Sequence, residues 1–341
     1  MERKLNFRQL PKYEPEKRSE IYLALNENPY DFPDEILEKV FKNLDTGKLK
    51  IYYDSPSDEL LEALARYTGQ PEKRISIGNG ADEIIYDIFL MFPDMKFYVC
   101  PPTYSCYSIF ASATGVKLNY VPLIGEMYEK LNLDELTKVL DESSVLFLPN
   151  PNNPTGQLFE KSDIERLLST GALIVLDEAY YEFSNVSYVE LLDKFDNLIV
   201  IRTFSKAFSL AAQRIGYIMA NEELIEYYNS LRLPYNVSYI SQQLALAVLE
   251  NLAYFKKRTS RIVQERERMK EILSKNGFKL TDSKANFIFI LTQDDEAKRI
   301  VEKLEKQNII VRKFEQGIRI SIGKSEENDL VLSALINKSE V

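Results

Sequence analysis

The 341-residue sequence contains no histidine, no tryptophan and only two cysteines. Without histidine there can be no Ser-His-Asp triad, no Cys-His dyad and no histidine-ligated metal site. Cys100 and Cys106 are too few for a structural zinc site or a disulfide framework, so we expect no metal and two buried, reduced thiols in a cytoplasmic protein. Acid-base chemistry near neutral pH must therefore use Lys, Tyr, Asp, Glu, Cys or a bound cofactor.

Long apolar runs are also missing. No stretch approaches the roughly 18 apolar residues that span a bilayer, and the charged start MERKLNFRQLPKYEPEKRSE lacks the apolar segment of a signal peptide. The net charge of -9, with both signs spread along the chain, argues against nucleic acid or an anionic membrane as the main partner. The apolar share of 45% is that of a globular protein, and the length favours two subdomains.

Residues 57 to 220 alternate apolar runs with segments of helical spacing, which predicts an α/β fold with a largely parallel, buried sheet. The predicted strands are residues 97–100, 118–122, 145–149, 173–177, 198–201 and 215–220. Predicted helices in the first part of the chain cover residues 33–44, 57–67 and 163–168, with another beginning near Ala81.

From about residue 222 the pattern changes to a smaller α+β unit. We expect helices at 222–232, 241–275 and 295–307, strands at 287–291, 309–312 and 318–322, and a last helix. The predicted organisation is an N-terminal arm (1–20), a small domain (21–44 and 233–341) and a large domain (45–232).

The segment RTFSKAFSLAAQRIGY (202–217) follows a predicted strand. Lys206 lies among apolar neighbours, where loss of solvation favours the neutral, nucleophilic amine, and Arg214 adds an anion-binding group. Because lysines are mostly exposed, the segment alone also allows a surface lysine in a loop.

Three further motifs have both a functional and a structural interpretation. VLFLPNPNNPTG (145–156) puts asparagines and rigid prolines at the C-terminal end of a strand, where ligands bind in open α/β sheets, although such residues also form plain turns. LIVLDEAYYEF (173–183) ends a strand in Asp177, a carboxylate of catalytic or structural use. GNGADE (78–83) can present N–H groups to an anion at the start of a helix, but it is a weak signal by itself.

In order and spacing these motifs resemble the fold-type I pyridoxal-phosphate (PLP) aminotransferases. That family has a glycine-rich phosphate loop, an aromatic residue, Asn-Pro-Thr-Gly, strand-Asp-x-x-Tyr, and Ser-Lys with an arginine eight residues later. The matching residues are GNGADE, Tyr104, Asn153-Pro-Thr-Gly, Asp177 with Tyr180, and Ser205-Lys206 with Arg214. The resemblance implies PLP as the cofactor and the transferase fold, with a large α/β domain around a mostly parallel sheet and a smaller α+β domain.

The resemblance also implies a role for each matched residue. Lys206 would hold PLP as a Schiff base and move a proton between substrate and cofactor, and Asp177 would keep the pyridine nitrogen protonated. Tyr180 and Asn153 would hydrogen-bond the phenolic oxygen, and Tyr104 would stack on the ring. The cofactor phosphate would be bound by Gly80, Ala81, Asp82, Thr203, Ser205 and Arg214.

Within this family the closer resemblance is to the histidinol-phosphate aminotransferases. It rests on Tyr13 in LPKYEPEKR, LNENP (25–29), IYYDSP (51–56) and the C-terminal IIVRKF and GIRISIG. By this resemblance the protein is a homodimer, and Tyr52 reaches into the partner's site to touch the PLP phosphate. The implied substrate-binding residues are Tyr13, Asn153, Arg312 and Arg319.

The implied reaction moves an amino group reversibly between L-histidinol phosphate and 2-oxoglutarate. In the biosynthetic direction glutamate donates the amine to imidazole acetol phosphate, in L-histidine biosynthesis. Two always-charged arginines suit a site that takes a phosphate in one substrate and two carboxylates in the other. An aromatic-amino-acid aminotransferase and a threonine-phosphate decarboxylase of the same fold are the alternatives. A ligand-sensing domain of a transcription regulator is disfavoured, because no basic nucleic-acid footprint is present.

Overall fold

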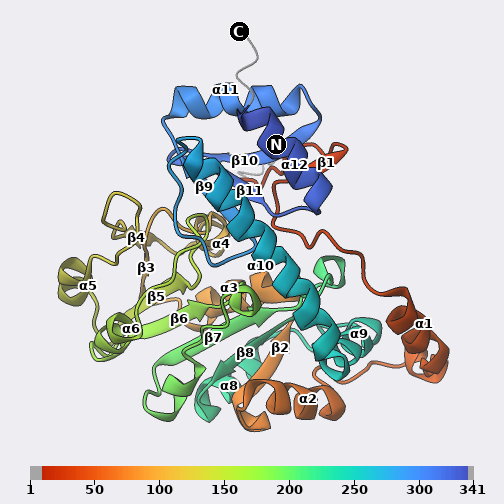
Figure 1. Cartoon of the computed structure of the whole chain (residues 1–341). Coiled ribbons are helices and arrows are strands. Elements are labelled where there is room, and N and C mark those ends of the chain that lie inside the picture. The colour runs from red at the N-terminus through yellow and green to blue at the C-terminus, as the bar shows by residue number, and fades with distance from the viewer. Residues whose placement is uncertain (1–9, 337–341) are drawn as a thin grey trace, which may run out of the picture.

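The computed structural model describes residues 10–336 and builds its larger sheet from seven strands in the order β2-β8-β7-β6-β5-β3-β4 (Figure 1). Strand β8 is antiparallel to β2 and β7, and the other neighbouring pairs are parallel. This confirms the expected, mostly parallel sheet. The strands are β2 (Ile75–Gly78), β3 (Lys96–Val99), β4 (Leu118–Tyr120), β5 (Ser144–Pro149), β6 (Leu173–Asp177), β7 (Leu198–Thr203) and β8 (Gly216–Ala220).

The central strands of this sheet are buried on both faces. Along β5, Val145 and Phe147 pack into one hydrophobic cluster, whereas Leu146 and Leu148 pack into another on the opposite face. Alternate residues of a strand point to opposite faces, so a continuous apolar run is what a doubly covered strand requires. The helices of this region are α2 (Asp58–Thr68), α3 (Gly80–Met91), α4 (Cys106–Thr114), α5 (Leu133–Val139), α6 (Lys161–Leu168), α7 (Tyr181–Ser184) and α8 (Glu222–Leu231).

The second sheet has four strands in the order β1-β10-β11-β9 and lies above the first in Figure 1. Strand β1 runs parallel to β10, although almost the whole chain separates them, so the segment that follows the arm belongs to the small sheet. Its elements are β1 (Ile21–Leu23), β9 (Phe287–Leu291), α11 (Asp294–Glu305), β10 (Ile309–Phe314), β11 (Gly317–Ser321) and α12 (Ser325–Ile336).

The predicted single helix at 241–275 is wrong, because the structure has two helices there. Helix α9 (Tyr239–Glu250) ends at Asn251, and α10 (Leu252–Lys275) begins directly after it. Asn251 has φ -118° and ψ 29°, which is not helical, and asparagine favours such a helix end over a helix interior. The break redirects the chain, so that α9 packs against α1 (Asp34–Asn43) and α2, while α10 runs from α9 up to the small sheet (Figure 1).

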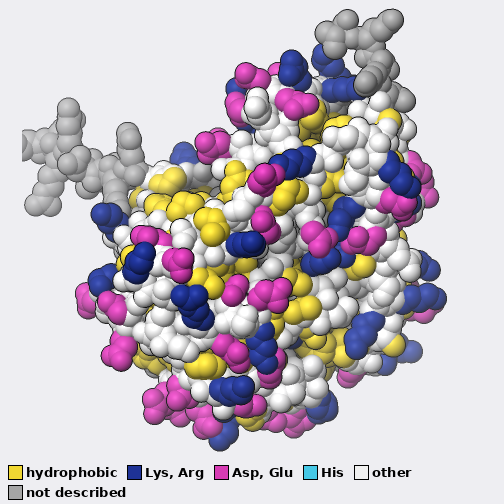
Figure 2. All heavy atoms as spheres, turned by 60° about the vertical axis from the view of Figure 1, so that its left-hand side comes forward, with side chains coloured by type: hydrophobic (Ala, Val, Ile, Leu, Met, Phe, Trp, Pro, Cys, Tyr) yellow, Lys and Arg dark blue, Asp and Glu magenta, His cyan; other side chains and the backbone are white. Residues whose placement is uncertain are grey.

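Charges of both signs alternate over the face shown in Figure 2, without a large patch of one sign. No helix within residues 10–336 is both long and apolar enough to cross a membrane. Both cysteines are buried and unpaired, as expected. The predicted limits of the arm and of the two domains stay predictions.

Candidate active site

A cavity of about 460 Å³ lies where the C-terminal ends of β6 and β7 meet the small sheet and the segment after β1. Ligands bind at this end of the strands in open α/β sheets. The cavity collects most of the residues that the sequence motifs singled out. Those on its lining are Tyr13, Ala81, Asp82, Tyr104, Asn153, Asp177, Tyr180, Thr203, Ser205, Lys206, Arg214 and Arg319.

Lys206 follows β7, and a hydrogen bond fixes the amine at the end of its side chain. Its Nζ donates a hydrogen bond of 2.8 Å to the carbonyl oxygen of Leu25, in the LNENP segment. Burial, together with the nearby positive charge of Arg319, lowers the pKa of the Lys206 amine to about 8. About a tenth of the amine is therefore neutral at pH 7 and available as a nucleophile, far more than for an exposed lysine.

Asp177 is the last residue of β6 and is buried. Burial raises its pKa to about 6, although hydrogen bonds from the Ala179 N–H and the Tyr107 hydroxyl oppose that rise. The Tyr107 hydroxyl donates to Oδ2 of Asp177 at 3.2 Å, and the Tyr107 side chain is fully buried. The sequence motifs missed Tyr107. The signal that could have found it is its place three residues after Tyr104, as the second residue of α4.

The end of the cavity at the start of α3 is suited to an anion. The first turn of a helix presents N–H groups that the helix itself does not use, here those of Ala81 and Asp82. Arg214 Nη2 lies 3.1 Å from the Asp82 carboxylate, which also accepts a hydrogen bond of 3.0 Å from the Tyr104 hydroxyl. Gly80 has φ +80°, and a Cβ at this position would collide with the Arg214 guanidinium.

Two hydroxyl groups lie near the same end. Thr203 Oγ1 donates to Ser205 Oγ at 2.9 Å, and both residues line the cavity. The structure therefore brings together N–H groups, hydroxyls and a guanidinium from three separate segments. Such donors are the ones that a phosphate group accepts from.

Tyr180 and Arg319 form a connected group on the side of the small sheet. The Tyr180 hydroxyl accepts from Asn26 Nδ2 at 2.9 Å and from Asn153 Nδ2 at 3.4 Å. Arg319 Nη1 donates to Asn153 Oδ1 at 2.6 Å, and Nη2 donates to the carbonyl oxygen of Ala24. The Nε of Arg319 is buried and has no partner in the described part of the chain. Asn26 lies in the LNENP segment, but the sequence alone predicted no role for it.

Three predicted site residues are not part of the cavity lining: Gly80, which directly precedes the lining residue Ala81, Arg312 and Tyr52. Arg312 forms an ion pair of 2.8 Å with Glu16, and its guanidinium lies 5.5 Å from the ring centre of Tyr13, which does line the cavity. Tyr52 has 82% of its side chain exposed and stacks on Tyr235, with 5.0 Å between ring centres. Within one chain, Tyr52 therefore contributes nothing to the walls of this cavity among the described residues.

Known proteins match nearly the whole length of the chain. Residues 18–335 match the family described as aminotransferase class I and II. The histidinol-phosphate aminotransferase of Thermotoga maritima is 52% identical over 326 residues, which are 95% of each chain.

Two solved structures share the fold. The histidinol-phosphate aminotransferase of Clostridium acetobutylicum superimposes with a TM-score of 0.84 at 25% identity, over 92% of this chain and 98% of that one. The enzyme of the same name from Sinorhizobium meliloti, in complex with pyridoxal-5'-phosphate, gives a TM-score of 0.84 at 26% identity, over 94% and 90%. These matches confirm the fold and the family that the order of the motifs predicted. The chain belongs to the aminotransferase class I and II family.

Proposed function

We propose that this chain is a PLP-dependent aminotransferase that transfers an amino group between L-histidinol phosphate and 2-oxoglutarate, in L-histidine biosynthesis. The observation that carries the proposal is one cavity that holds the amine of Lys206, with its lowered pKa, together with the buried carboxyl group of Asp177 and the guanidinium groups of Arg214 and Arg319. The histidinol-phosphate aminotransferase of Thermotoga maritima, which is 52% identical over 95% of this chain, supports the choice of substrate.

The cavity fits PLP group by group. The N–H groups of Ala81 and Asp82 and the guanidinium of Arg214 suit its phosphate, and Gly80 leaves room for Arg214 to approach. Asp177 suits the pyridine nitrogen, because a carboxylate accepts a hydrogen bond from a protonated ring nitrogen. When bound, PLP supplies an aldehyde that takes up the amino group and a ring that accepts the electrons left by the departing Cα proton.

Lys206 has two tasks in this proposal. Its neutral amine would hold the cofactor through the aldehyde group, and Nζ, when it is not engaged in this way, would accept the Cα proton of the substrate. The Lys206 pKa of about 8 is close to neutral pH, and a general base is most efficient when its pKa is near the working pH. The carbonyl oxygen of Leu25 accepts a hydrogen bond from this amine, which uses one N–H and leaves the lone pair of the neutral amine free to react.

Asp177 and Tyr180 suit two groups of opposite charge on the cofactor. With a pKa of about 6, Asp177 is mostly ionised at pH 7 and can stabilise a protonated ring nitrogen. Burial raises the pKa of Tyr180 to about 12, so its phenol stays protonated and can donate a hydrogen bond to an oxygen anion of the cofactor. Asn26 and Asn153 orient that phenol by donating to its oxygen.

Arg319 and Arg312 are the proposed binding groups for the substrate anions. Arg319 lines the cavity, and its buried Nε has no hydrogen-bond partner among the described residues. Arg312 is engaged by Glu16, so binding a substrate phosphate would require it to exchange this carboxylate for the phosphate. A phosphate accepts more charge-assisted hydrogen bonds than one carboxylate, so the exchange favours the phosphorylated substrate.

A homodimer that completes each site with the partner's tyrosine is part of the same proposal. Tyr52 is highly exposed and lies in an apolar surface region with Leu49, Ile51, Leu233 and Tyr235, each at least half exposed. Large apolar groups exposed together are typical of an interface. A cytoplasmic location also belongs to the proposal, in keeping with the two unpaired thiols.

Relative turnover tests the choice of substrate. The purified protein with PLP is given histidinol phosphate, phenylalanine or threonine phosphate, with 2-oxoglutarate as the amino acceptor, and glutamate and carbon dioxide are both measured. We expect the highest kcat/KM with histidinol phosphate. A higher value with phenylalanine would make the protein an aromatic-amino-acid aminotransferase, and release of carbon dioxide from threonine phosphate would make it a decarboxylase.

A further inference from the structure

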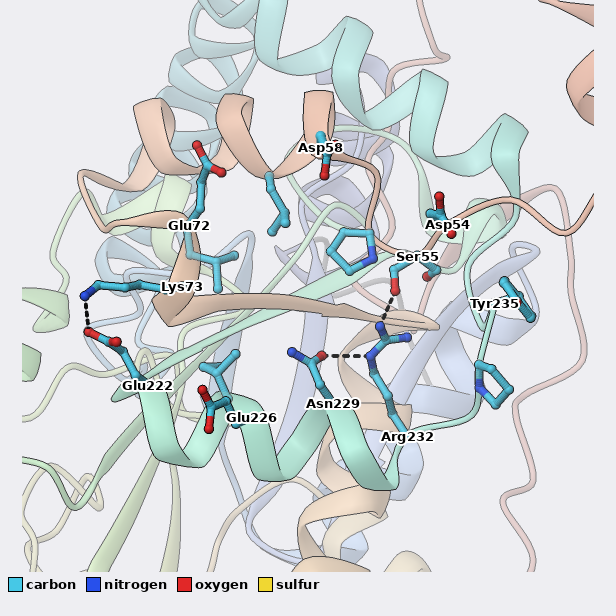
Figure 3. Close-up of a pocket in the computed structure, with 15 residues that line it drawn as sticks. Asp54, Ser55, Asp58, Glu72, Lys73, Glu222, Glu226, Asn229, Arg232 and Tyr235 are labelled. Carbon is cyan, nitrogen blue, oxygen red and sulfur yellow. Dashed lines mark hydrogen bonds and ion pairs between the residues drawn. The ribbon is translucent and has the colours of Figure 1, made fainter.

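The segment that carries Tyr52 is attached to the chain that follows α8. Figure 3 shows Arg232, at the end of this helix, pointing at Ser55, with Asn229 beside it. Arg232 Nη2 donates to the carbonyl oxygen of Ser55, and Nε donates to Asn229 Oδ1 at 2.9 Å. The position of Tyr52, three residues before Ser55, therefore depends on the loop at 232–237.

Asn236, in the same loop, uses both ends of its side-chain amide. Its Oδ1 accepts from the Ser55 hydroxyl at 2.8 Å and from Arg232 Nη1 at 3.0 Å. Its Nδ2 donates to the Glu83 carboxylate at 2.6 Å. The oxygen therefore faces the Tyr52 segment, and the nitrogen faces the first turns of α3.

Asn236 also contacts the phosphate loop, which is the GNGADE segment at residues 78–83. Glu83 Oε2 also accepts from the backbone N–H of Asn79 at 2.5 Å, and Asn79 Nδ2 donates to the carbonyl oxygen of Asn236 at 2.9 Å. Asn79 directly precedes Gly80, Ala81 and Asp82, whose backbone is the proposed phosphate site. Asn236 thus contacts the loop twice, through its carbonyl oxygen and through its side chain.

We propose that Asn236 is a positioning residue that joins two active sites: it fixes the phosphate loop of its own site and the Tyr52 segment that completes the partner's site. The inference rests on the proposed homodimer. The simpler alternative is that Asn236 only caps the local structure. An asparagine supplies both the acceptor for Ser55 and the donor for Glu83, so replacing the donor alone separates the two possibilities.

The first test measures cofactor binding by equilibrium dialysis. Asn236→Asp keeps the size and the acceptor but turns a carboxylate oxygen toward Glu83. We expect the Kd for PLP to rise about tenfold, which corresponds to about 1.4 kcal/mol and to the loss of one hydrogen bond. The Kd for pyridoxal, which has no phosphate, should stay within twofold, because the loop is needed only for the phosphate.

Two further variants complete this test. Asn221→Asp is the matched control, because Asn221 accepts from the Leu224 N–H and donates to the carbonyl oxygen of Asp196, with no contact to the phosphate loop or the Tyr52 segment, so its Kd for PLP should stay unchanged. Glu83→Ala removes the acceptor that Asn79 and Asn236 share and should weaken PLP binding as Asn236→Asp does. An unchanged Kd for PLP in both Asn236→Asp and Glu83→Ala would overturn the positioning role.

The second test uses mixed dimers with a single live site. One chain keeps Lys206, and its partner carries Lys206→Ala, so the live site takes its phosphate loop from the first chain and its tyrosine from the second. Asn236→Ala in the first chain should raise the Kd for PLP. Asn236→Ala in the second chain should lower kcat/KM by about as much as Tyr52→Phe does there.

The outcomes of the second test are distinct. If Tyr52→Phe in the second chain lowers activity and Asn236→Ala in that chain does not, the link between the sites is wrong although the shared site stands. If Tyr52→Phe has no effect there, the shared site and the link both fall, and the dialysis result alone decides whether Asn236 positions the phosphate loop.

Discussion

Arg312 and Arg319 are register partners on the antiparallel strands β10 and β11. Directly opposed residues project to the same face of a sheet, and like charges in this position destabilise it. Arg312 is balanced by Glu16, whereas the buried Arg319 has hydrogen bonds to Asn153 and Ala24 but an unpartnered Nε among the described residues. Two adjacent positive charges with incomplete compensation favour the binding of an anion between them.

Replacing Arg312 should distinguish between substrates. In Arg312→Ala we expect kcat/KM for histidinol phosphate to fall by about one to two decades, since a charge-assisted hydrogen bond contributes about 1.5–3 kcal/mol and each decade is about 1.4 kcal/mol. Phenylalanine, with one carboxylate for Arg319, should lose less. Lys313→Ala is the control, because Lys313 is the next residue and pairs with Asp294 instead. An equal loss for both substrates would contradict a specific role in binding phosphate.

Removing Asp177 should separate binding from turnover. Asp177→Ala keeps Lys206 and the phosphate loop, so it should still bind PLP, but turnover should fall by several decades because the ring nitrogen loses the carboxylate that stabilises its protonated form. Absorbance of the bound cofactor and steady-state rates are measured on the same preparation. Turnover near that of the unaltered protein, with PLP bound, would exclude this role.

Tyr107 should set the pH range in which the cofactor binds well. The pKa of Asp177 is about 6, and the carboxyl group must be ionised to hold a protonated ring nitrogen, so the Kd for PLP should rise as the pH falls through about 6. The Tyr107 hydroxyl lowers this pKa. In Tyr107→Phe the pKa is therefore higher, and the loss of affinity should begin at a higher pH.

The control for Tyr107 is Tyr188→Phe, because the Tyr188 hydroxyl donates to the carbonyl oxygen of Phe159, outside the cavity. Its pH profile should match that of the unaltered protein. A shift to lower pH in Tyr107→Phe, or none, would show that the hydrogen bond does not stabilise the ionised carboxyl group.

Breaking the buried pair of Arg202 and Glu178 should cost far more stability than breaking an exposed ion pair. Their side chains are 2% and 0% exposed and lie 2.9 Å apart. Arg202→Met leaves a buried carboxylate without its counter-charge, and we expect the free energy of unfolding to fall by about 3–5 kcal/mol. Lys275→Met, which breaks the exposed pair with Glu271, should cost less than about 1 kcal/mol. The free energy of unfolding of both variants is measured in urea. Equal losses in the two variants would contradict the prediction.

Much of the fold could be predicted from the sequence because its strands are continuous apolar runs with polar residues at their ends. Strand β2 was missed, since ISIG at 75–78 is short and merges with the glycine loop. The break at Asn251 was missed because apolar residues continue on both sides of it, at Leu249 and Leu252. A single non-helical residue changes the direction of the chain but hardly changes the hydrophobic pattern.

The same distinction applies to the candidate site. Residues that lie in motifs, such as Lys206 and Asp177, could be placed from the chain order alone. Contacts between distant segments could not: Asn26 meets Tyr180 across 154 positions, and Asn236 meets Glu83 across 153. Such pairs depend on how the two sheets and their loops pack, and one sequence carries no signal for that packing.

Lys206 is the residue proposed to bind the cofactor, and the proposed reaction depends on it. The protein with bound PLP is reduced with borohydride, digested and mapped by mass spectrometry, with Lys206→Ala treated in parallel. We predict the mass of the pyridoxyl group on the peptide that contains Lys206, and no stoichiometric label in the variant. A stoichiometric label on any other lysine of the unaltered protein would contradict the account.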